Sequence, residues 1–181
     1  AEANPKVRIG LVPCAVGGTS IDKWTPGTYD EATKTHPYDD AAARIAVAMR
    51  GGVVRGMLWH QGESDTRPDA TAAYLSKLAG LIGRIRALTG QPALPVVVGE
   101  LGRFREANRP FNAQLPQVLP LVPPAALVTA EELTDKGDQL HFDAASADEL
   151  GRRYATQMLA LERAASKVKT RAGLKVKTRE N

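Results

Sequence analysis

The sequence has one cysteine among its 181 residues, and it has no apolar run near the roughly 18 residues that a membrane helix needs. The lone Cys14 excludes an intrachain disulfide framework, and its place at the end of an apolar run predicts a buried free thiol. The first residues contain neither the basic stretch nor the apolar stretch of a leader peptide. We therefore expect a soluble chain without membrane contact, with a core held by packing alone.

Excess positive charge is confined to one end of the chain. Residues 163–181 contain seven Lys or Arg and one Glu, which leaves 17 basic and 19 acidic residues in 1–162. The folded part is thus mildly acidic, and we expect no nucleic-acid partner. Since 43% of the chain is hydrophobic, residues 1–164 are predicted to form one domain. Residues 165–181 carry a repeated Lys-Val-Lys-Thr-Arg and lack an apolar face, which predicts a solvated, disordered basic tail.

Apolar runs alternate with segments of helical periodicity along the chain. This alternation predicts a parallel sheet covered by helices on both faces, the arrangement of an α/β domain. The strands are expected at residues 7–12, 53–59, 94–99 and 125–130, and the helices at about 40–49, 69–88, 111–119 (short and irregular because of its prolines) and 144–163.

Polar residues gather after three of these four strands. In parallel α/β sheets, ligands bind beyond the carboxyl ends of the strands. Glycine and hydroxyl residues occupy positions 17–20, the sequence Trp-His-Gln-Gly-Glu-Ser-Asp occupies 59–65, and Asp-Gln-Leu-His-Phe occupies 138–142. We expect the three loops to converge on one crevice.

These loops contain the groups that acyl transfer requires. The backbone N–H of Gly18 and the carboxamide of Gln61 are suitable donors to an oxyanion. Asp138 lies three residues before His141, so one turn can bring the carboxylate to the imidazole and create an oriented base. Each signal is weak alone, because glycine pairs are common in turns, and an Asp can cap a helix while a His serves only as a loop residue.

Taken in order, residues 13–21 (Pro-Cys-Ala-Val-Gly-Gly-Thr-Ser-Ile), 59–65 and 138–142 resemble the sialate O-acetylesterase-like branch of the SGNH hydrolases. This branch includes the acetylxylan esterases of carbohydrate esterase family 6. The resemblance implies a flavodoxin-like three-layer α/β/α fold. It also implies hydrolysis of acetyl esters on oligo- or polysaccharides, with no metal or organic cofactor. Exported family members are common, so the resemblance favours the periplasm or the cell exterior, although the sequence itself assigns no location.

The resemblance also implies a role for each matching residue. His141 becomes the general base, Asp138 its orienting carboxylate, Gly18 and Gln61 the oxyanion donors, and Glu63 an acid that organises its loop.

One family feature has no match in this sequence. The family begins with a strand that ends in a Gly-Gln-Ser-Asn-like block bearing the nucleophile, and residues 1–6 contain no such block. We therefore expect an esterase domain without its first strand, incomplete at the N-terminus, with an exposed apolar seam where that strand would lie between its neighbours. Three alternatives remain: a nucleophile at Ser20 or Ser64; a catalytically inactive carbohydrate-binding fragment or pseudoenzyme; and a metallohydrolase using His60, Glu63, Asp65, Asp138 and His141.

Overall fold

The computed structural model describes residues 5–177, with side chains up to residue 167, and has a parallel sheet at its centre. The strand order is β1 (Met57–Trp59), β2 (Val96–Gly99) and β3 (Ala125–Val128). Val97 of β2 lies opposite Leu58 of β1 and Ala126 of β3. The predicted α/β class with a parallel sheet is confirmed, and β1 begins four residues later than expected.

Helices follow the predicted periodicity closely. Proline occupies the first turn of both α1 (Pro37–Ala48) and α2 (Pro68–Thr89), where its missing N–H costs no helical hydrogen bond. Gly90 ends α2 in the left-handed conformation at φ 66°, and its N–H donates to Ala87 O. The expected irregular helix is divided into α3 (Asn108–Gln114) and the 3-10 helix η3 (Leu115–Leu121). The structure also has two short 3-10 helices, η1 (Ile21–Trp24) and η2 (Glu63–Asp65).

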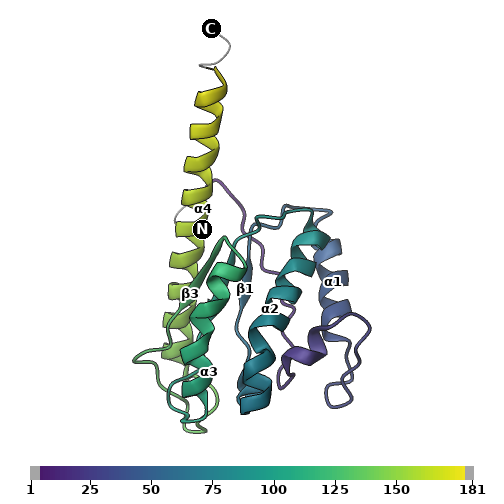
Figure 1. Cartoon of the computed structure of the whole chain (residues 1–181), viewed down its shortest axis with the longest axis vertical. Coiled ribbons are helices and arrows are strands. Elements are labelled where there is room, and N and C mark those ends of the chain that lie inside the picture. Colours follow the sequence, from purple (N-terminus) through teal and green to yellow (C-terminus); the bar gives the residue numbers. More distant parts are fainter. Residues whose placement is uncertain (1–4, 178–181) are drawn as a thin grey trace.

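Two separate cores cover the two faces of the sheet. Successive strand residues point to opposite faces, so Val96 and Val98 pack with Leu78 of α2, while Val97 packs with Leu150 of α4 (Ala144–Lys177). Helices α2 and α3 thus lie on one face and α4 on the other, which gives the three layers seen in Figure 1. Cys14, predicted to be buried, is only half-buried against the first core.

The predicted strand at residues 7–12 is wrong. This segment forms no strand, and Leu11 is 83% exposed. A strand exists only where a neighbour can pair with its backbone, and the described residues provide no neighbour for this segment. The sheet instead ends at β1, where Leu58 is 53% exposed. An apolar side chain is therefore exposed at this edge of the described sheet.

The final helix is longer than predicted. It continues to Lys177 instead of ending near residue 163, and Figure 1 shows its last turns projecting beyond the sheet. Residues 165–177 contain no proline and several Ala, Lys and Arg, so the helix can propagate without a break. The expected disordered tail is therefore helical as far as residue 177, and its remainder lies outside the described residues. The domain boundary at 164 stays a prediction. No described helix has the length and apolar character needed to cross a membrane.

Candidate active site

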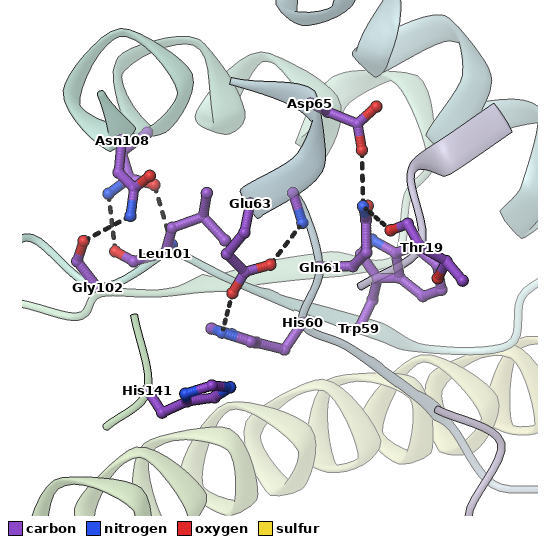
Figure 2. Close-up of polar contacts among 12 residues, drawn as sticks. Thr19, Trp59, His60, Gln61, Glu63, Asp65, Leu101, Gly102, Asn108 and His141 are labelled. Carbon is purple, nitrogen blue, oxygen red and sulfur yellow. Dashed lines mark hydrogen bonds and ion pairs between the residues drawn. The ribbon is translucent and has the colours of Figure 1, made fainter. Parts of the chain in front are cut away.

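The predicted loops meet at the carboxyl edge of the sheet. Gln61 Nε2 donates to Thr19 O at 2.9 Å, and Ser64 Oγ donates to Gly18 O at 3.1 Å, so the first two loops are in direct contact. The ring of Phe142, next to His141, lies 5.7 Å from that of His60. The convergence expected from the sequence is thus observed, and Figure 2 shows residues of all three loops together.

Asp138 and His141 form a hydrogen-bonded pair within one turn. His141 Nδ1 lies 2.7 Å from Asp138 Oδ2, and Asp138 Oδ1 accepts the backbone N–H groups of His141 and Leu140 at 2.9 and 3.0 Å. These hydrogen bonds, from His141 first, hold the pKa of the Asp138 carboxyl well below its usual range. Gln139 adopts φ 54°, which closes the turn. The imidazole is 61% exposed, and its Nε2 makes no hydrogen bond with the described residues.

Glu63 contacts two other residues of the second loop, and its predicted role in organising this loop stays a prediction. Its Oε2 accepts the N–H of Gly62 at 3.1 Å, and its Oε1 lies 3.7 Å from Nε2 of His60. Burial lowers the pKa of His60, against the opposing effect of the Glu63 charge, and thus favours the neutral imidazole. In the view of Figure 2, His60 lies between Glu63 and His141.

The Gln61 carboxamide has other partners in this structure. Its Nε2 donates to Thr19 O and to Asp65 Oδ2, at 2.9 and 2.6 Å, which uses both N–H bonds, and its Oε1 lies 3.1 Å from the Tyr74 hydroxyl oxygen. Gln61 must release one partner before it can donate to an oxyanion. Its role as a donor stays a prediction.

Gly18 presents a backbone that suits its predicted role. It adopts φ 76°, a conformation that favours glycine, and open space surrounds the position of a Cβ. No described residue accepts a hydrogen bond from its N–H.

Glu100 is a buried acid at the carboxyl edge of the sheet that the sequence analysis missed. It directly follows β2 and is 7% exposed. Its carboxylate accepts two hydrogen bonds from Arg103, at 2.9 and 3.0 Å, and further ones from Thr129 Oγ1 and Ala130 N at 2.9 and 3.0 Å. The sequence contained one signal for Glu100, because an acid stands there immediately after a wholly apolar strand. Glu100 joins the loops after β2 and β3.

Two of the alternatives from the sequence lack geometric support. Ser64 Oγ donates to Gly18 O, and in the described structure neither Ser64 nor Ser20 hydrogen-bonds to His141. Within residues 5–177 no three His, Cys, Asp or Glu side chains are close enough to hold a metal ion, so the metallohydrolase alternative has no ligand cluster.

A hollow of about 450 Å³ lies between β3 and α4, and neither Asp138 nor His141 lines it.

Comparison with known proteins adds to this geometry. Residues 1–160 match the model of the SASA family, described as carbohydrate esterase, sialic acid-specific acetylesterase. The "Probable carbohydrate esterase At4g34215" of Arabidopsis thaliana is 31% identical over 160 residues, which is 83% of this chain and 55% of that protein. This chain therefore spans little more than half the length of that relative.

Solved structures agree on the fold. The X-ray structure of the Arabidopsis thaliana protein AT4G34215 has a TM-score of 0.76 and 27% identity, over 86% of this chain and 62% of that one. XAC1771, a carbohydrate acetylesterase from Xanthomonas citri, has a TM-score of 0.52 and 18% identity, over 59% of this chain and 26% of that one. The second similarity concerns the fold alone.

Proposed function

The chain belongs to the SASA family of carbohydrate esterases, and from this premise we propose that it supplies the acid/base side of a serine esterase that hydrolyses O-acetyl esters on sugars. The observation that carries the proposal is the 2.7 Å contact between Asp138 Oδ2 and His141 Nδ1 beside two glycine-containing loops. A carboxylate on Nδ1 fixes the proton there and leaves Nε2 as the basic nitrogen.

Each half of the proposed reaction has two proton transfers through His141. Its Nε2 takes the proton of a serine hydroxyl while the serine oxygen attacks the acetyl carbonyl. The proton then passes to the sugar oxygen as the ester C–O bond breaks, and the acetyl group stays on the serine. Water repeats the sequence, which releases acetate and restores the hydroxyl.

Negative charge develops on the carbonyl oxygen in both steps. The free N–H of Gly18 is the donor best prepared to stabilise it, and one such donor contributes about 3 kcal/mol to the transition state. Gln61 becomes a second donor if it releases Thr19 or Asp65 when substrate binds.

We propose that the nucleophilic serine is carried by a segment that adds to the open edge of the sheet. Met57 N–H donates to Pro95 O, so by alternation the backbone groups of Leu58 point toward the unpaired side of β1. A parallel strand paired there ends at the same edge of the sheet as the three loops. Its last residues then lie near Gly18 and His141.

The family and the aromatic residues of the site support a proposal for the substrate class. The rings of Phe142 and Phe104 lie 5.4 Å apart, and both are half-buried. Such rings suit the apolar face of a sugar, while charged groups such as Arg103 suit its hydroxyls. We propose an acetylated oligo- or polysaccharide as substrate.

A second candidate is a carbohydrate-binding chain without turnover. Neither Ser20 nor Ser64 hydrogen-bonds to His141 in the described structure, so His141 does not activate these two serines there. The two candidates differ in acetate release from acetylated xylooligosaccharide, because only an esterase produces acetate.

The test adds a strand with a Gly-x-Ser block ahead of residue 7. We expect this protein to release acetate and to react stoichiometrically with an organophosphonate, and the same protein with that serine changed to alanine to do neither. Organophosphonate labelling of Ser20 or Ser64 in the unextended chain would show that the nucleophile has been wrongly assigned.

A further inference from the structure

A buried polar network joins the first two loops beneath the site. Trp24 Nε1 donates to Thr19 Oγ1 at 3.1 Å, and that hydroxyl donates to Val16 O at 2.8 Å. On the other side, Trp59 Nε1 donates to the Tyr74 hydroxyl at 3.0 Å, and Tyr74 donates to Gln61 O at 2.8 Å. Each loop is thus tied to the core by its own tryptophan.

Asp65 links the two halves of this network. It is 1% exposed, and its Oδ2 accepts the backbone N–H of Ile21 at 2.9 Å and Nε2 of Gln61 at 2.6 Å. These donors come from different loops and converge on one oxygen. The Asp65 backbone is fixed as well, because its N–H donates to Gly62 O and its carbonyl accepts Thr71 Oγ1, both at 2.8 Å.

The Asp65 carboxylate has no ion-pair partner in the described part of the chain. The nearby cation Lys77 pairs with Asp22 at 2.6 Å instead. Removing a carboxylate from water without a cation is unfavourable unless hydrogen bonds replace the lost solvent. The hydrogen bonds from Ile21 N–H and Gln61 Nε2 therefore stabilise the buried carboxylate, and through it they connect the two loops.

We propose that Asp65 is a positioning residue that holds residues 17–21, and with them the N–H of Gly18, in register with the second loop. The structural part of this inference stands on the contacts of Asp65. Its consequence for catalysis rests on the proposed esterase function. Figure 2 shows the arrangement, with Gln61 between Thr19 and Asp65.

Two substitutions separate positioning from general packing. Asn at position 65 keeps a carbonyl oxygen that can accept from both Ile21 and Gln61, whereas Leu has a similar shape and accepts from neither. If Asp65 served only to fill the core, Leu would be tolerated better than Asn. If it positions the loop, the order is reversed.

Amide hydrogen exchange of this chain, followed by NMR, provides the direct readout. In Asp65→Leu we expect the Ile21 amide to exchange at least tenfold faster relative to the Val97 amide of β2, which reports general loss of stability. In Asp65→Asn we expect a change below threefold. Equal acceleration of Ile21 and Val97 in the Leu variant, or a greater effect of Asn than of Leu, would overturn the proposal.

Two further measurements complete the test. The Ile21 amide proton of Asp65→Asn should resonate upfield of its wild-type position, because a neutral acceptor replaces a charged one, and an unchanged resonance contradicts the proposal even if the Leu variant does not fold. In the strand-extended protein, Asp65→Leu should lower kcat at least tenfold with KM within twofold, and Asn should restore kcat. If no variant releases acetate, the proposed function fails, while the exchange data still decide the role of Asp65.

Discussion

Tyr154 of α4 donates its hydroxyl hydrogen to the backbone oxygen of Trp59 at 2.8 Å, which ties the last helix to the end of β1 beside His60. Tyr154→Phe should therefore keep the ring packing but leave a buried carbonyl with one partner fewer, at a cost of about 1 kcal/mol. For a chain of this size that lowers Tm by about 3 °C. Tyr29→Phe is the matched control, since Tyr29 is 39% exposed and should unfold as wild type does. Equal Tm values for the two variants would contradict the assigned role.

Removal of the buried Glu100 carboxylate should cost more stability than removal of an exposed loop acid. Glu100→Ala leaves the N–H of Ala130 without an acceptor and removes the two hydrogen bonds that Arg103 donates to Glu100, so among the described residues the guanidinium keeps only Thr129 and Glu131 as partners. We expect a loss of about 2 kcal/mol in urea unfolding, because Arg103 is partly exposed and water recovers part of the interaction. Glu106→Ala breaks an exposed pair with Arg109 and should cost less than about 0.5 kcal/mol. Similar losses in both variants would count against a structural role of Glu100.

Alanine substitution at two glycines should change the free energy of unfolding in opposite directions. At Gly99 a Cβ would overlap the hydroxyl of Tyr154, so Gly99→Ala should displace that side chain and destabilise by about 2 kcal/mol. At Gly83, inside α2, no atom lies within 4 Å of the Cβ position, and Gly83→Ala should stabilise by about 0.5 to 1 kcal/mol. Thermal unfolding of the two variants checks the difference in sign.

Burial of His60 predicts a pH dependence of stability. Because its pKa is lowered in the folded state, the unfolded chain binds a proton more tightly. Its contribution is therefore fully present above the unfolded pKa of about 6.5 and is lost as pH falls through the folded pKa. The free energy of unfolding should decrease more between pH 7.5 and 5.5 in wild type than in His60→Gln. An identical decrease in the two proteins would show that another group is responsible.

Local patterns in the sequence predicted much of this molecule. The helical spacing of Leu78, Ile82 and Ile85 and the apolar run of β2 each indicated an element, because burial of one face or of both determines the residues there. The contact between Asp138 and His141 was predictable for a similar reason, since both lie in a single turn.

Features that depend on distant partners were not predictable in the same way. Residues 7–12 have the composition of a strand, but pairing requires a neighbour that composition does not reveal. The orientation of the Gln61 amide depends on Thr19 and Asp65, of which one lies 42 residues away in sequence. The position of Glu100 against Thr129 likewise requires β2 and β3 to be adjacent.

The central claim is that His141, oriented by Asp138, is the base of an acetylesterase site. Its most direct test is acetate release from an acetylated xylooligosaccharide by the strand-extended protein, with His141→Ala compared with His36→Ala, which changes a histidine outside the site. We expect kcat to fall by about 10²- to 10⁴-fold in His141→Ala and to stay within twofold in His36→Ala. Undiminished acetate release by His141→Ala would contradict the account.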